Sequence, residues 1–422
     1  MATLCSGGHY HARMSEGVPA PATGAPAPAS DPGAPASGPG IPGLRQVGRP
    51  FPVLGPMAPF ARAALLATLA ISVGAIVLDF VVHVDKTVVF VVSAAGILGL
   101  AWMVGLATER LGALTGPQVG GVLNATFGNI AELIIAFFAL QAGLIEVVKA
   151  SLTGSIIGNL LFVLGLSVFL GGLRNGTQRF DQRIAGSNAA LLVVAAIGLF
   201  VPAVFAYSTS GLAGLAAGGQ PASGGTITEE SVLVAVLLMT GYAAALVYQF
   251  RNPAATLGAH EPVAGHGGPP WTGRVAVAVL LVAAGLLAVL SEILVDSIEP
   301  FIASFGLSAF FVGVVLIPTI GNLAEHLVSV QLAVKNKMEF SMAVSYGSSL
   351  QVALFVAPVL VIAGALMGQP MNLVFHPLEI AAVAAAVGIS ALIAFDGESN
   401  WLEGALLMIV YVILAVSFFE LR

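Results

Sequence analysis

The pentapeptide Gly128-Asn129-Ile130-Ala131-Glu132 returns as Gly321-Asn322-Leu323-Ala324-Glu325, 193 residues further along the chain. At the same offset, Gly154-Ser155 corresponds to Gly347-Ser348 without a gap. A register held over this distance indicates an internal duplication rather than a chance match. Each copy also places a glutamate inside an otherwise apolar run, and this carboxylate is the feature that a function must explain.

The composition is typical of a membrane protein. Of the 422 residues, 58% are hydrophobic and only 9% are charged, and the mean hydropathy is +0.98. Soluble domains carry about 25% charged residues, so this chain lacks the polar surface that a soluble protein needs. We therefore predict an all-α polytopic membrane protein. The net charge of −6 gives no indication of nucleic-acid binding, and the single cysteine, Cys5, excludes an intrachain disulfide and a cysteine metal site.

Residues 1–58 are rich in Pro, Ala and Gly, and we predict a disordered tail that is not a signal peptide. Eleven apolar segments of spanning length follow, at about 61–81, 87–108, 118–142, 146–172, 184–206, 231–250, 273–296, 306–333, 338–366, 375–395 and 401–420. If the first is an extra helix, residues 59–250 hold it and a first five-helix repeat. Residues 251–272 then form an inter-repeat cytoplasmic loop, and 273–422 hold the second five-helix repeat.

The lysines and arginines predict the orientation. With a cytoplasmic N-terminus, only Lys86, Lys149 and Arg422 of the 15 basic residues fall outside. Eleven spans then put the C-terminus outside, and five spans per repeat invert one copy relative to the other. Glu132 and Glu325 would enter from opposite faces and meet near the midplane, which is typical of transporters. The Ala/Gly-rich composition favours a bacterial inner (plasma) membrane, although a vacuolar protein would have a similar composition.

The repeated pentapeptide has the chemistry of a hard-cation site. A carboxylate in hydrocarbon costs at least about 2.5 kcal/mol, so Glu132 and Glu325 need a partner, a proton or a cation. Asn129 and Asn322 offer amide oxygens, and Pro318 loosens the helix before the second copy. Carboxylate, amide and unwound-backbone oxygens suit Ca²⁺ and related ions. The alternative is a neutral glutamate that hydrogen-bonds a neighbouring helix.

The spans that follow each pentapeptide supply further oxygens, or could orient the carboxylates. These candidate ligands are Ser155, Asn159, Ser348, Ser349 and Gln351. For the serines, ordinary small-residue packing is the alternative. His326 follows Glu325, where the first copy has Leu133. A histidine there could relay protons or be a polar core residue bonded to backbone.

These motifs resemble a known family. Gly-Asn-x-x-Glu-Leu at 128–133 and Gly-Asn-x-x-Glu-His at 321–326 resemble the two signature repeats of the calcium/cation–proton exchanger (CAX) family, within the calcium/cation antiporter superfamily. Residues 123–127, 154–161, 347–354, 375–379 and 400–405 also look like blocks of that family. The resemblance runs from about residue 60 to the C-terminus.

The resemblance implies an eleven-helix fold in which Glu132 and Glu325 hold Ca²⁺ and protons alternately. It also implies roles for His326, Asn129, Asn322 and the serine and glutamine positions of the adjoining helices. It implies no cofactor other than the transported ions, and the lipid bilayer as surroundings. Two features depart from the family: the loop at 251–272 holds one acid where an acidic segment is common, and the long tail has no counterpart.

We therefore expect a secondary active antiporter, not an enzyme, which exports Ca²⁺ or a related divalent cation from the cytoplasm. Protons would drive the export by competing for the two glutamates. The main alternative is a sodium/calcium exchanger of the same superfamily, which a Na⁺ requirement would identify. A channel would leave the titratable pair unexplained. An intramembrane hydrolase lacks support, because neither His-Glu-x-x-His nor Gly-x-Ser-x-Gly occurs.

Overall fold

The computed structural model describes residues 59–116, 119–120, 123, 126–216, 225–251 and 271–421. The predicted tail, residues 1–58, lies outside these residues, as does the predicted 251–272 loop except for its ends. The predictions for these two segments therefore stay predictions.

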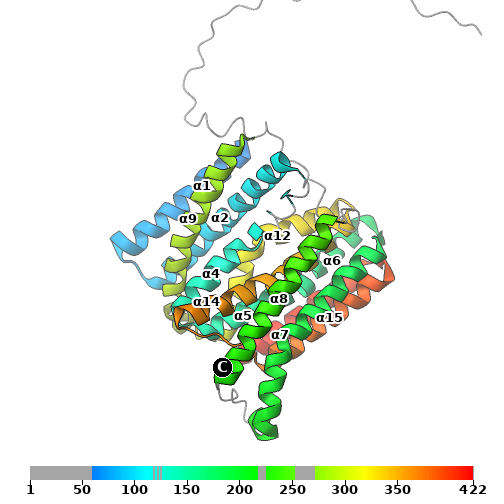
Figure 1. Cartoon of the computed structure of the whole chain (residues 1–422). Helices are drawn as coiled ribbons and strands as arrows, with labels where there is room; N and C mark the ends of the chain where they lie inside the picture. Colours follow the sequence, from blue (N-terminus) through cyan, green and yellow to red (C-terminus); the bar gives the residue numbers. More distant parts are fainter. Residues whose placement is uncertain are drawn as a thin grey trace, which may run out of the picture. The chain divides into compact units, whose positions relative to one another are not determined.

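The described chain is built almost entirely of helices (Figure 1). Ten of its helical segments are long and apolar enough to cross a membrane, and α4 (Ile130–Gln141) is a shorter apolar helix. In chain order the ten are α1 with η2 (Pro59–Val77 and Leu78–Val82), α2 (Lys86–Thr115), α5 with η3 and α6 (Ile145–Ile157, Gly158–Val163 and Leu164–Asn175), α7 (Gln182–Ala216), α8 (Gly225–Arg251), α9 (Gly273–Asp296), α11 with η6 and α12 (Ala309–Phe311, Val312–Leu316 and Ile317–Val334), α13 with η7 and α14 (Met338–Gln351, Val352–Val356 and Ala357–Met367), α15 (Pro377–Asp396) and α16 (Trp401–Glu420). A further short helix, α10 (Ile298–Phe305), joins α9 to α11.

These helices confirm the predicted all-α membrane fold. Ten of the eleven predicted spans coincide with them, although α2 and α7 continue seven and ten residues past the predicted ends. The third predicted span, 118–142, differs, because its described continuous helix covers only Ile130–Gln141. Two short strands were not predicted: β1 (Gln178–Arg179) pairs antiparallel with β2 (Glu398–Ser399).

Side-chain caps explain why the last two helices begin where they do. His376 and Glu379 form a capping box at the start of α15, and Asn400 and Glu403 form another at the start of α16. Each box satisfies backbone N–H groups that the first helical turn leaves free. At its other end α15 is terminated by Gly397 at φ 70°, a left-handed conformation that glycine adopts without steric cost.

The helix contacts between the two repeats are reciprocal: where a helix of the first repeat contacts one of the second, the equivalent helices with the repeats exchanged are also in contact. At the offset of the duplication, α4 corresponds to α12, α5 to α13, α6 to α14 and α7 to α15, and in chain order α2 corresponds to α9 and α8 to α16. The exchanged contacts are α4 on α9 and α12 on α2, α15 on α5 and α7 on α13, and α16 on α6 and α8 on α14. Such an exchange relates the copies by an approximate two-fold axis. The helix α1 lies outside this pairing and packs against α2, which also packs against α9 (Figure 1).

The two copies of the pentapeptide differ in backbone conformation. Gly128 and Asn129 form a turn before α4, with Asn129 at φ −97° and ψ 22°. Gly321 and Asn322 lie inside the continuous helix α12. The expected loosening at Pro318 is found in the preceding turn, since the helix widens into the π-helical turn η6 (Val312–Leu316) directly before the proline, which cannot donate to the carbonyl one turn earlier. Unwound backbone at the motif is therefore found in the first copy only.

Candidate ion-binding site

Glu132 lies at the centre of a small polar cluster between the repeats. It occupies the first turn of α4 and is 1% exposed. Its carboxylate accepts hydrogen bonds from the hydroxyl of Ser155 on α5 and, at 3.4 Å, from Nδ2 of Asn322 on α12. Asn322 Nδ2 also lies 3.3 Å from Ser155 Oγ. A carboxylate and a hydroxyl of the first repeat thus share one amide of the second.

A second cluster repeats this pattern with the repeats exchanged. Ser348 of α13 donates to Oδ1 of Asn129 at 2.9 Å, and Nδ2 of Asn129 donates to Oε1 of Gln351 at 2.7 Å. Asn159 of η3 donates to Ser348 Oγ at 3.0 Å. The Asn129–Ser348 contact is the duplicate of the Asn322–Ser155 contact. Seven of the ten predicted site residues therefore lie in two clusters, each built from both repeats.

Of the remaining three, Glu325 hydrogen-bonds with Ser348 of the second cluster, Ser349 donates to the carbonyl of Ser345 in its own helix at 3.0 Å, and His326 lies beside Glu325 on α12. Within the described residues, Glu325 Oε2, Asn322 Oδ1 and His326 Nδ1 are buried and have no hydrogen-bond partner. A buried polar atom without a partner carries a desolvation penalty of about 1–3 kcal/mol. Among the predicted site residues, these three atoms would therefore gain a partner from a bound cation or proton.

Close helix packing brings the second motif against the first glutamate. A Cβ added to Gly321 would lie 3.5 Å from both Cα and Cβ of Glu132, so α12 passes against α4 at this point. The serines are followed by matching irregularities, because the π-helical turns η3 and η7 begin three to four residues after Ser155 and Ser348. Such turns occur frequently at functional sites in helices.

The donor set is poor in acids. No group of three or more His, Cys, Asp or Glu that could hold a metal ion occurs among the described residues. A cation at this position would depend on the two glutamates, with amide and hydroxyl oxygens completing the shell. Oxygen-only ligand sets of this kind are those of Ca²⁺.

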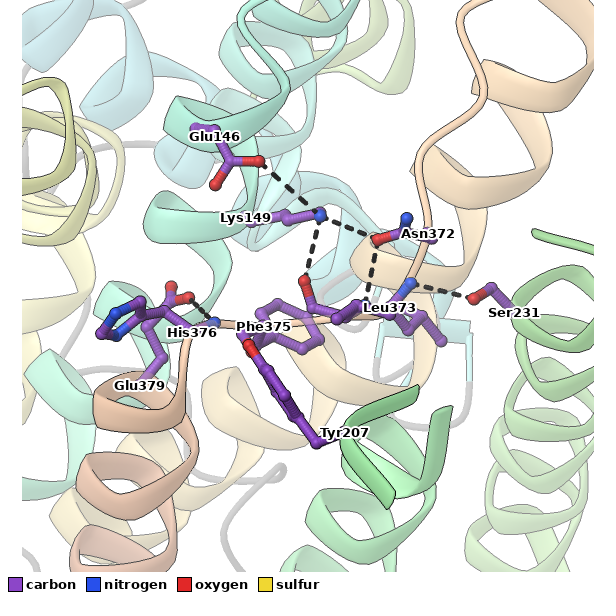
Figure 2. Close-up of polar contacts among 10 residues, drawn as sticks. Glu146, Lys149, Tyr207, Ser231, Asn372, Leu373, Phe375, His376 and Glu379 are labelled. Atoms are coloured by element: carbon purple, nitrogen blue, oxygen red, sulfur yellow. Dashed lines mark hydrogen bonds and ion pairs between the residues drawn. The ribbon is translucent and has the colours of Figure 1, made fainter. Parts of the chain in front are cut away.

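Sequence reasoning did not anticipate a second buried polar network, which surrounds Lys149 on α5 (Figure 2). Its ammonium group donates to Oδ1 of Asn372 at 2.8 Å and to the carbonyl of Val374 at 3.0 Å. Glu146 lies one turn earlier, with its carboxylate 3.8 Å from the ammonium. The charge distribution places Lys149 among the basic residues on the outer side, yet its side chain is buried, with 3% exposed. The position of Lys149, one turn inside the predicted span 146–172, was the sequence feature that could have indicated its burial.

We call residues 371–376, between α14 and α15, the strap. Besides Lys149, two residues of the first repeat hold its backbone: Tyr207 donates to the carbonyl of Phe375 at 3.0 Å, and Ser231 accepts from the N–H of Leu373 at 3.0 Å (Figure 2). Glu379, just after the strap, is buried and accepts from Thr153 of α5 at 2.6 Å. The strap thus ties the second repeat to α5, α7 and α8.

Comparison with known proteins gives consistent results. The profile of the family described as sodium/calcium exchanger protein matches residues 86–251 and 275–419. The "Ca(2+)/H(+) antiporter" of Synechocystis sp. is 45% identical over 354 residues, covering 79% of this chain and 91% of the relative. The "Ca(2+)/H(+) antiporter ChaA" of Bacillus subtilis is 41% identical over 355 residues, covering 82% and 95%.

The solved structure of native YfkE has the same fold. It superposes with a TM-score of 0.71 at 37% identity, covering 84% of this chain and 99% of YfkE. A structure described as the H⁺/Ca²⁺ exchanger CAX superposes with a TM-score of 0.66 at 15% identity, which shows a shared fold.

Proposed function

The chain belongs to the sodium/calcium exchanger family, and from this membership we propose that it is an antiporter that exchanges Ca²⁺, or a related divalent cation, for protons. Three relatives that are 41–45% identical to this chain, and whose alignments cover 91–95% of their own length, are named Ca²⁺/H⁺ antiporters. Their names support protons rather than Na⁺ as the coupling ion. The observation that carries the proposal is the pair of exchanged clusters, which gathers both repeats around two glutamates.

In this mechanism Glu132 and Glu325 bind the cation when they are deprotonated and release it when they are protonated. Competition of Ca²⁺ and protons for the same two carboxylates couples their movements. Each state balances the buried charge before the repeats rearrange, since an uncompensated carboxylate pair would be costly to move through the membrane interior.

The neutral residues have supporting roles. The amide oxygen of Asn322 has no hydrogen-bond partner in the structure, so it is free to ligate the cation. Asn129, Asn159, Ser155, Ser348 and Gln351 hydrogen-bond across the repeat boundary, so they orient the ligands and supply further oxygens. His326, beside Glu325, takes part in proton coupling.

The proposed location is a bacterial inner (plasma) membrane, with the N-terminus in the cytoplasm and the C-terminus outside. The distribution of lysine and arginine supports this orientation. The cation would then leave the cytoplasm as protons enter it.

Uptake of ⁴⁵Ca²⁺ into reconstituted vesicles with an imposed proton gradient and no Na⁺ tests the proposal. We expect uptake that collapses when a protonophore is added. Uptake that requires Na⁺ would make the protein a sodium/calcium exchanger with the same site. Uptake that persists after the gradient has collapsed, without proton movement, would contradict coupled exchange.

A further inference from the structure

Four serines form a buried hydroxyl cluster on one side of the candidate site. They are Ser167 of α6, Ser329 of α12, and Ser341 and Ser345 of α13, and each is at most 1% exposed. Ser329 Oγ lies 3.1 Å from Ser167 Oγ, 2.9 Å from Ser341 Oγ and 3.3 Å from Ser345 Oγ. One hydroxyl therefore connects three helices.

The hydrogen bonds of the hydroxyl cluster are unusual for serines in membrane helices. Serines elsewhere in this chain, such as Ser93 and Ser297, donate to the carbonyl one turn earlier in their own helix. The bonds of Ser329 instead run to other helical segments, namely to three hydroxyls and, at 3.1 Å, to the carbonyl of Ser341. Close packing of small residues requires no such network, and alanine would serve it equally well.

The duplication supplies an internal comparison. At the offset of 193 residues, the four serines correspond to Leu360, Ala136, Val148 and Leu152. All four of these residues are apolar and at most 1% exposed. Buried hydroxyls thus occur in one copy of these positions only, and the equivalent positions of the other copy hold apolar side chains.

Buried polar atoms without partners lie at both ends of the hydroxyl cluster. Glu325, whose Oε2 is one of them, precedes Ser329 by four residues, which is one helical turn on the same face. Ala333 is one turn beyond Ser329, and its carbonyl accepts from Gln178 at 2.9 Å. Gln178 Oε1 is the second such atom, and the next residue, Arg179, is exposed. From Glu325 to Ala333 the column rises about 12 Å along α12.

We propose that the hydroxyl cluster is a proton path between the glutamate site and the membrane side at which α12 ends and α13 begins. This inference rests on the proposed function for the existence of the proton flux. Each hydroxyl accepts a proton on its oxygen and passes on the proton that it carried, so one proton is transferred and every serine ends as a neutral hydroxyl. In the proposed orientation this side is the cytoplasm, and protons leave there as Ca²⁺ enters the site.

The test compares two transport modes in proteoliposomes. Ca²⁺/H⁺ exchange, followed with a pH-sensitive dye, needs the proton path, whereas ⁴⁵Ca²⁺/Ca²⁺ exchange at equal pH does not. We expect Ser329→Ala to slow Ca²⁺/H⁺ exchange about tenfold and to leave Ca²⁺/Ca²⁺ exchange within about twofold. Ser329→Thr retains the hydroxyl and should restore the proton-coupled rate. Ser93→Ala, a buried serine outside the hydroxyl cluster, is the matched control.

The outcomes separate the inference from the proposed function. Wild-type protein that moves Ca²⁺ without protons would contradict the proposed function before any variant is compared. With proton coupling intact in the wild type, an equal loss of both modes in Ser329→Ala would assign the serine a packing role. An unchanged Ca²⁺/H⁺ rate would also overturn the proton path. If Ser329→Ala fails to fold, Ser345→Ala provides the same comparison.

Discussion

The amide of Asn322 lies 3.3 Å from the hydroxyl of Ser155, across the boundary between the two repeats. The equivalent residues with the repeats exchanged, Asn129 and Ser348, are also hydrogen-bonded, at 2.9 Å, with the serine as the donor. Each motif therefore completes its hydrogen bonds with a helix of the other copy. Neither repeat forms these contacts by itself.

The two glutamates are expected to be essential for exchange. Replacing Glu132 or Glu325 by Gln retains the size and hydrogen-bonding capacity of the side chain but removes the negative charge that a divalent cation and a proton compete for. We expect each variant to lose at least about 99% of proton-driven ⁴⁵Ca²⁺ uptake, as removal of a proton-transfer group typically does. Glu299→Gln, an exposed glutamate on α10, is the control and should transport normally. Near-normal uptake by either site variant would refute the shared-carboxylate mechanism.

The Asn129–Ser348 contact should show energetic coupling. The apparent Ca²⁺ affinity would be measured for the wild type, Asn129→Ala, Ser348→Ala and the double variant. Because the side chains share a hydrogen bond, we expect the double variant to lose less than the sum of the single losses, by about 0.5–1.5 kcal/mol. The Asn322–Ser155 pair should give a coupling of the same sign. Strict additivity in both cycles would mean that these contacts do not support the site.

Lys149 is expected to matter for stability more than its single charge suggests. Lys149→Met leaves the carbonyl of Val374 without the ammonium donor and leaves Oδ1 of Asn372 with only the N–H of Val374, at a cost of about 1–3 kcal/mol in the free energy of unfolding. Lys86→Met is the matched control: Lys86 pairs with Asp79 but is 41% exposed, so its loss should cost less than about 1 kcal/mol. Unfolding in detergent, followed by tryptophan fluorescence, would rank the two. Equal stabilities would show that the strap does not depend on Lys149.

The duplicated glycines before the serines should respond differently to alanine. A Cβ at Gly154 would lie 2.6 Å from the Cα of Val314, whereas a Cβ at Gly347 would meet nothing within 4 Å. We expect Gly154→Ala to destabilise the protein by about 1–3 kcal/mol or more through overpacking. Gly347→Ala should be neutral or slightly stabilising, because alanine favours a helix over glycine. Thermal unfolding of the two variants gives the comparison, and a reversed order would contradict the packing of α5 against η6.

The sequence was sufficient for the helical membrane fold, because hydropathy over a span of about 20 residues does not depend on tertiary contacts. The register of the duplication also pointed to the residues that the structure gathers in the two clusters. Their roles in transport stay predictions, as do the limits of the two repeats.

Other features depended on partners distant in the chain. The network around Lys149 joins α5 to a segment more than 200 residues later, and no local pattern encodes that contact. The hydroxyl cluster also depends on contacts between distant segments. From the sequence alone, a serine in a membrane helix is equally consistent with ordinary small-residue packing. The straight course of α12 through Gly321 was missed because a glycine permits unwinding without requiring it.

The strap and the segment with β1 occupy equivalent places in the two repeats, but they are held by different means. The β1 segment is tied to β2 through strand pairing of the main chain, which most side chains allow. The strap is held by the side chains of Lys149, Tyr207 and Ser231, for which few residues can substitute. During divergence of this protein, the linker between α6 and α7 is therefore less constrained in sequence than the strap, except at Gln178, whose side chain donates to Ala333 and Asn336. The strap and its three anchors must change together or not at all.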